Sequence, residues 1–157
     1  MKDFKVSLEF SPRFHEIDRY GILHHSVYFC WFECGRIALM EKVGIHLEAL
    51  HREGYQFVVS ELKTKFRGSV RPGMQVRLVT SLINRPLNKL TFRQCVIHSI
   101  SRELLVEAQV ELVALKAGQL QFRLPEAIVS SWFLSQPEEL DPTPSLNLIN
   151  KENVHAN

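Results

Sequence analysis

The chain has 157 residues, of which 45% are hydrophobic and 23% are charged, and its formal net charge is +2 at pH 7. This length suits one domain with a full hydrophobic core and is short for two domains joined by a linker. So small a net charge argues against nucleic acid as a partner, and no stretch approaches the roughly 18 apolar residues of a membrane span. We therefore expect one soluble domain that binds neither nucleic acid nor membrane.

The cysteine content indicates a reducing compartment. There are three cysteines, at positions 30, 34 and 95, in a chain whose size does not call for disulfide bonds. An odd number of thiols fits a cytosolic protein better than a disulfide framework. The expected location is the cytoplasm.

The N-terminal third has first the alternating pattern of a strand and then the periodicity of a helix. Lys5–Phe10 places apolar residues on one face of a half-buried strand, which Pro12 ends. Residues 26–43 have a helical pattern that is apolar nearly all round at its start, so this helix should be central and buried. The residues assigned to its apolar stripe are Val27, Cys30, Trp31, Cys34, Ile37, Ala38 and Met40.

The rest of the pattern changes to that of strands. Gly44 ends the long helix, and residues 45–54 read as a shorter one closed by a second glycine. Short connections make the strands that follow antiparallel neighbours. The predicted strands cover residues 56–66, 75–84, 89–99 and 104–116.

A tight turn at residues 117–119 leads into residues 120–124, and residues 125–132 form a short helix that begins at a proline. Residues 1–133 then make one domain, and residues 134–157 a flexible or loosely docked tail, because prolines and asparagines replace large apolar residues there. The fold class is α+β, with an antiparallel sheet of about five strands wrapped around the long helix. The free edge of such a sheet favours pairing of two copies.

The segment before the long helix carries the chemistry. Asp18 and Gly21 precede His24 and His25 at the start of the helix. A helix N-terminus combines unpaired backbone N–H groups with the positive end of the helix dipole, so it can polarise a carbonyl oxygen while a nearby carboxylate attacks or activates water. This arrangement favours acyl transfer.

The same residues resemble the hotdog-fold thioesterases of the 4-hydroxybenzoyl-CoA and acyl-CoA thioesterase type, over residues 6–131. The resemblance is carried by a motif similar to the family's Asp-Thr-Asp, Gly, His, Tyr and Trp-Phe-Glu pattern. Glu16 replaces the family's first acid, Ile17 its threonine, and Ser69 a proline in a later turn. The residues that match or take up the motif are Glu16, Ile17, Asp18, Gly21, His25, Tyr28, Trp31, Phe32 and Glu33.

The resemblance implies a hotdog fold and hydrolysis of an acyl-CoA or aroyl-CoA thioester, by a homodimer or homotetramer, without metal or other cofactor. The catalytic acid falls on Asp18, as nucleophile or as general base. His25 would orient the substrate or stabilise the oxyanion, with the backbone N–H groups of His25, Ser26 and Val27 as oxyanion donors. Tyr28 lines the acyl pocket or packs in the core.

A basic strip is a candidate for the phosphates of coenzyme A. Lys63, Lys65 and Arg67 alternate on one face of a strand that leads to Arg71. A solvated strand face is the ordinary interpretation of such a run, but phosphates need cations. Arg67 and Arg71 are the preferred candidates for substrate binding.

Two sets of residues on the long helix have alternative interpretations, and the function has two rivals. Glu33 is either a second candidate base or the partner of Arg36 in an i,i+3 ion pair, and the ion pair is preferred. Cys30 and Cys34 would pack in the core rather than bind a metal. A hotdog dehydratase built around His25 and Glu33, and a non-catalytic module that binds acyl-CoA or an acyl carrier, are the rival functions.

Overall fold

The computed structural model describes residues 4–83 and 86–133. Within them, one short 3-10 turn (η1), three helices and six strands follow in the order β1, η1, α1, α2, β2, β3, β4, β5, β6, α3. Their bounds are β1 Lys5–Phe10, η1 Phe14–Glu16, α1 His25–Lys42, α2 Leu47–Arg52, β2 Tyr55–Phe66, β3 Val76–Leu82, β4 Leu90–His98, β5 Leu104–Lys116, β6 Gln119–Leu120 and α3 Glu126–Phe133.

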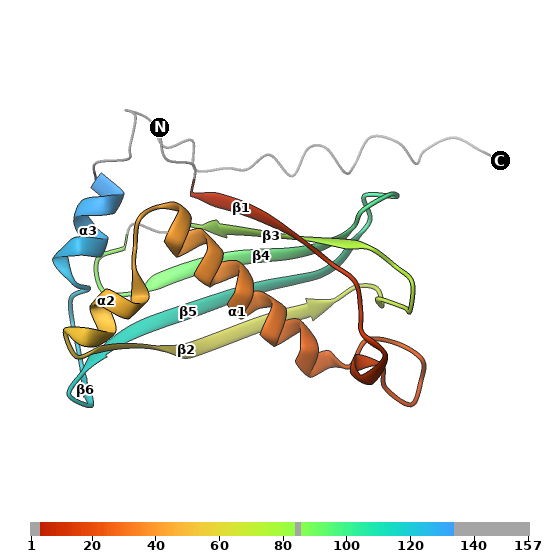
Figure 1. The fold of residues 1–157 in the computed structure, drawn as a ribbon, viewed down its shortest axis with the longest axis horizontal. Coiled ribbons are helices and arrows are strands. Elements are labelled where there is room, and N and C mark those ends of the chain that lie inside the picture. Colours follow the sequence, from red (N-terminus) through yellow and green to blue (C-terminus); the bar gives the residue numbers. More distant parts are fainter. Residues whose placement is uncertain (1–3, 84–85, 134–157) are drawn as a thin grey trace.

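The strands form one antiparallel sheet in the order β1-β3-β4-β5-β2, and β6 adds a short pair to β5. Helix α1 crosses one face of this curved sheet (Figure 1) and packs on β1, β3 and β4. The predicted α+β architecture is therefore confirmed. Strand β2 lies at one edge of the sheet although it follows the helices directly in the chain.

The buried face of α1 differs from the predicted stripe. The sheet side is formed by large side chains together with one glycine and one arginine: Tyr28, Trp31, Phe32, Gly35, Arg36, Leu39 and Met40. Cys30 and Cys34 are exposed, so the prediction that they pack in the core was wrong. The helix carries apolar residues on two faces, and the face with the aromatic side chains, which have more area to bury, turns inward.

The other predicted elements lie within a few residues of the observed ones. Residues 120–124 contribute only the end of β6, and Phe122 is almost fully exposed. Asn84, the predicted end of the third strand, and the predicted tail at 134–157 lie outside the described residues. None of the helices in the described part of the chain is long and apolar enough to span a membrane.

Candidate functional site

The segment between η1 and α1 folds back on itself. Ile17 and Leu23 form an isolated antiparallel bridge, the Asp18 N–H donates to the Ile22 carbonyl (2.8 Å), and the Gly21 N–H donates to the Asp18 carbonyl (3.0 Å). Gly21 has φ +75°, a left-handed conformation that glycine adopts without the steric cost of a side chain. The result is a tight loop with Asp18 at its base.

The loop also orients the Asp18 carboxylate. Its Oδ1 atom accepts hydrogen bonds from the backbone N–H of Tyr20 (2.7 Å) and of Ile22 (3.4 Å). Its Oδ2 atom has no hydrogen-bond partner among residues 4–83 and 86–133. Asp18 is half-buried. One oxygen therefore fixes the side chain, and the other is available to a ligand.

Three hydrogen bonds tie this loop to the rest of the fold. The His24 N–H donates to the Glu16 carbonyl and the Leu23 N–H to the Val70 carbonyl, both at 2.8 Å. The Val70 N–H in turn donates to the Tyr28 hydroxyl (3.2 Å). The acid, the first turn of α1 and the segment after β2 are thus held as one unit.

Tyr28 packs as a core residue in this chain. It is 3% exposed, and its ring makes edge contacts with Trp31 and Phe66. Burial raises the pKa of the Tyr28 phenol, while the hydrogen bond from Val70 acts in the opposite direction. Tyr28 therefore supports the position of Val70 whether or not it also contacts an acyl group.

The first turn of α1 offers one open backbone donor. His24 is the N-cap residue, and its Nδ1 atom accepts from the Ser26 N–H (3.3 Å), while the Val27 N–H donates to the His24 carbonyl (2.9 Å). The His25 N–H has no acceptor in the described part of the chain. Two of the three predicted oxyanion donors are thus already occupied, and the His25 N–H is free.

The two histidine side chains lie together at the helix start. The rings of His24 and His25 stack with their centroids 4.3 Å apart, and both residues are exposed. The structure therefore brings His25 to the same end of α1 as Asp18.

The two predicted arginines have different surroundings. Arg71 directly follows Val70, whose carbonyl accepts from the Leu23 N–H, and its guanidinium has no partner among the described residues. Arg67 instead forms an ion pair with Glu107 (3.1 Å) across the sheet. Arg71 is thus a cation without an ion pair, next to a residue that holds the loop, whereas Arg19 in the loop itself lies over the Tyr20 ring.

Glu33 and Arg36 do not form the predicted ion pair. The Arg36 side chain turns inward, is 6% exposed, and donates from Nη1 to the Gln94 Oε1 atom (3.0 Å), whereas Glu33 is exposed. Burial lowers the pKa of Arg36, and the nearby charge of Glu33 acts in the opposite direction. The sheet, rather than the preceding turn, therefore sets the direction of Arg36.

The arrangements for the rival chemistries are less favourable within this chain. His25 and Glu33 are eight residues apart on α1, roughly 12 Å along the helix axis, so they do not converge on one atom. No group of three or more His, Cys, Asp or Glu side chains that could hold a metal ion is found in residues 4–83 and 86–133.

Sequence reasoning missed the groups that position Asp18. The Asp18–Tyr20 contact is an Asx-type turn, which an aspartate three residues before a glycine can indicate. The contacts of Val70 join segments far apart in the chain, and no local pattern predicts them.

Residues 12–133 match the family model of the thioesterase-like superfamily. The chain belongs to this superfamily. Its order of strands around α1 is that of the hotdog fold.

Relatives with known names fit this assignment. The chain is 26% identical over 123 residues to the chloroplastic acyl-acyl carrier protein thioesterase ATL2 of Arabidopsis thaliana; the match covers 78% of this chain and 65% of that protein. A hypothetical protein of Thermus thermophilus, TT1821, has 29% identity and a TM-score of 0.73, over 82% of this chain and 97% of that one. The DHNA-CoA thioesterase of Staphylococcus aureus has 21% identity and a TM-score of 0.74, over 83% and 92%, a likeness of fold.

Proposed function

We propose that this protein hydrolyses acyl-CoA or aroyl-CoA thioesters with Asp18 as the catalytic carboxylate. The observation that carries the proposal is the Asp18 carboxylate, fixed through Oδ1 beside the start of α1 while Oδ2 has no partner in the described residues. A carboxylate is poised there for use as a nucleophile or as a general base.

Hydrolysis can follow two routes, and the same oxygen atom of the substrate gains negative charge in both. As a nucleophile, Asp18 attacks the thioester carbonyl, the thiolate leaves, and water then cleaves the resulting anhydride. As a base, Asp18 takes a proton from water, whose oxygen attacks the carbonyl directly; the carbon–sulfur bond then breaks, and the leaving thiolate takes up the proton from Asp18. In both routes the carbonyl oxygen gains negative charge, which the His25 N–H and the helix dipole of α1 stabilise.

The donor of the acyl group is a CoA thioester in this proposal. The names of the similar proteins include both an acyl-acyl carrier protein thioesterase and a DHNA-CoA thioesterase. The chain spans 65% of the length of the first of these proteins. The substrates in both names are therefore compounds to test on this protein, and neither is assigned to it. The exposed, unpaired thiols of Cys30 and Cys34 favour a reducing compartment such as the cytoplasm.

Release of free thiol from a panel of acyl-CoA and aroyl-CoA thioesters tests the proposal, with Asp18→Asn as the diagnostic variant. This change keeps the shape of the side chain and removes its charge, so we expect turnover to fall by about 10²- to 10⁴-fold. Glu16→Gln is the matched control, because the Glu16 carboxylate bonds only to the Arg13 N–H of its own turn (2.7 Å). Its turnover should stay within about threefold of the parent.

Two results would contradict the assignment of Asp18. Turnover that survives Asp18→Asn moves the acid to Glu33 or elsewhere. Binding of acyl-CoA with no turnover by either protein favours the non-catalytic module.

A further inference from the structure

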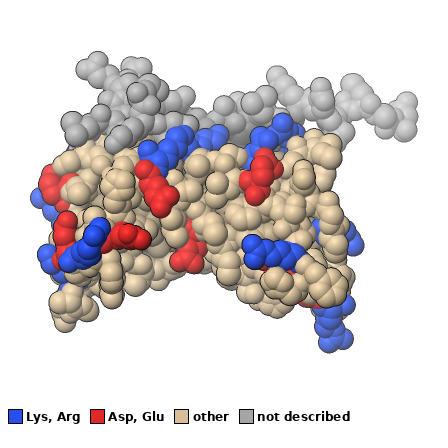
Figure 2. Space-filling view, viewed as in Figure 1, with Lys and Arg blue, Asp and Glu red and all other residues tan. Residues whose placement is uncertain are grey.

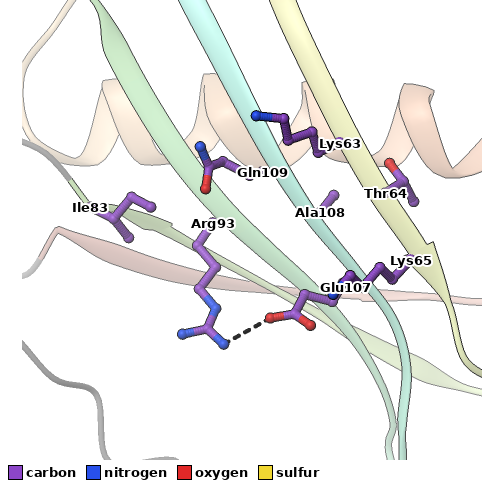
Figure 3. A pocket seen from close by; sticks show the side chains of 8 residues that line it. All are labelled: Lys63, Thr64, Lys65, Ile83, Arg93, Glu107, Ala108 and Gln109. Atoms are coloured by element: carbon purple, nitrogen blue, oxygen red, sulfur yellow. Dashed lines mark hydrogen bonds and ion pairs between the residues drawn. The ribbon is translucent and has the colours of Figure 1, made fainter.

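The face of the sheet opposite α1 carries a hollow of about 600 Å³. Its lining comes from β2, β4, β5 and the residue that follows β3, and α1 lies behind these strands (Figure 3). The volume is within the range of small-molecule sites and exceeds the needs of a single inorganic ion. The lining residues are Lys63, Thr64, Lys65, Ile83, Arg93, Glu107, Ala108 and Gln109.

Strand register gathers cations around this hollow. Lys63 on β2 pairs with Gln109 on β5, and Gln109 pairs with Arg93 on β4, so two cations flank one amide in a single row. Neighbouring strands lie about 4.8 Å apart, so this row spans roughly 10 Å. Lys65 lies in the adjacent row, opposite Glu107.

The charges do not cancel inside the hollow. Three lining residues are cationic and one, Glu107, is anionic; Lys63 is also paired with Glu61, which lies outside the lining (3.1 Å). Both Glu107 oxygens are engaged, Oε2 by Arg67 (3.1 Å) and Oε1 by Arg93 (2.8 Å). Lys65 makes no ion pair or hydrogen bond within residues 4–83 and 86–133. A polyanion of small-molecule size is the ligand that this arrangement fits.

The helix-covered face has a different charge pattern. Its acidic and basic side chains are interspersed and separated by uncharged surface (Figure 2). On the opposite face, the alternating cations of β2 run toward the end of the strand where Phe66 contacts Tyr28, the residue that supports Val70 beside the Asp18 loop. Lys63 and Phe66 are three residues apart, about 10 Å along the strand.

We propose that this hollow binds the phosphate-bearing nucleotide of the CoA thioester, with Lys65 and Arg93 as its principal cations. The inference rests on the proposed function for the identity of the ligand. Ile83 and the aliphatic stems of the lysines provide apolar contact for the nucleoside, and the cations contact its phosphates. The arm that joins nucleotide to thioester then passes the end of β2 toward Asp18.

The kinetic test compares two thioesters of one acyl group, one on CoA and one on N-acetylcysteamine, which has no phosphate. For Lys65→Gln/Arg93→Gln we expect the KM for the CoA thioester to rise at least about tenfold, because two surface cations no longer contact phosphate. Its kcat and the KM for the N-acetylcysteamine thioester should be unchanged. Arg52→Gln, on exposed α2, is the control for loss of charge alone.

A binding test does not depend on turnover. Calorimetric titration of the full chain with 3′,5′-ADP should show binding that the double variant loses and Arg52→Gln keeps, and far-UV circular dichroism confirms that both variants are folded. One outcome separates the two proposals: the parent binds 3′,5′-ADP but hydrolyses no thioester, and the double variant loses the binding. This result would support the hollow as the nucleotide site and reject the proposed function.

Three results overturn the proposal. The first is 3′,5′-ADP binding that is absent in the parent or unchanged in the double variant. The second is an equal rise of KM for both small thioesters. The third is a rise of KM only for an acyl carrier protein thioester, which would assign the cations to an acidic protein partner instead.

Discussion

Gly35 permits a close approach of α1 to the sheet. A Cβ atom placed there would lie against the Thr80 hydroxyl and within 2.8 Å of a Leu78 methyl group. Thr80 is fully buried and accepts a hydrogen bond from Gln94 (2.8 Å), so it has little freedom to move. The glycine therefore lets a helix and a polar row of the sheet pack directly.

Replacement Gly35→Ala should lower the free energy of unfolding by about 1–2 kcal/mol. Overpacking costs about 1–3 kcal/mol, and the higher helix propensity of alanine returns up to about 1 kcal/mol. Urea denaturation measures the change. Cys34→Ala, on the exposed face of the same helix, should stay within about 0.5 kcal/mol of the parent. Equal stability of both variants would show that the helix can shift to admit a methyl group.

Glu107 links Arg67 and Arg93 and makes stability depend on pH. Hydrogen bonds from Arg67 and Arg93 hold the pKa of the Glu107 carboxyl below its ordinary value, and burial acts in the opposite direction. A depressed pKa contributes stability above the ordinary value, and this contribution is lost as the pH falls through the folded-state pKa.

We therefore expect Glu107→Gln to be less stable than the parent near pH 7 and the difference to shrink on acidification. Thermal melts at a series of pH values measure it. Glu53→Gln, at the exposed C-cap of α2, is the control. A difference that is constant with pH would show that the carboxylate charge does not act through the two arginines.

At the scale of elements, the alternation of residues predicted the strands, but the helical periodicity did not predict which face of α1 is buried. The alternation in Lys5–Phe10 and Leu104–Lys116 predicts both strands with their observed bounds, because each has one face on the core. In α1, Cys30 and Cys34 have helical spacing with other apolar residues, yet they are exposed. Burial of Arg36 on the opposite side depends on Gln94, 58 residues away, which no local period can indicate.

The candidate site also has features that the sequence predicts and features that depend on the three-dimensional structure. The position of Asp18 before the helix, and the resemblance of its motif, are properties of a short stretch of sequence. The loss of the Ser26 and Val27 N–H groups to His24 depends on the local geometry of the cap. The engagement of Arg67 by Glu107 depends on the register between β2 and β5.

At the scale of the whole molecule, β2 forms one edge of the sheet among the described residues. It is a 12-residue strand at one end of the sheet order, and Val58, Val59 and Phe66 are 38%, 48% and 51% exposed. Residues 55–60 of β2 carry no charged side chain, and an apolar edge of this kind pairs with other strands unless charges or covering segments prevent it. A second copy of the same strand is the simplest partner, because antiparallel pairing of identical edges closes a twofold-symmetric dimer.

Pairing of two copies through β2 predicts that Val59→Lys shifts the protein from dimer toward monomer. Since Val59 is half exposed in the single chain, a lysine there costs the monomer little, whereas at a paired edge its ammonium must be desolvated. Light scattering coupled to size-exclusion chromatography measures the mass over a dilution series. Leu120→Lys, at 49% exposure in β6, is the matched control and should leave the mass unchanged. If both variants keep the mass of the parent, β2 is not the surface through which two copies pair, and the apolar edge requires a different partner.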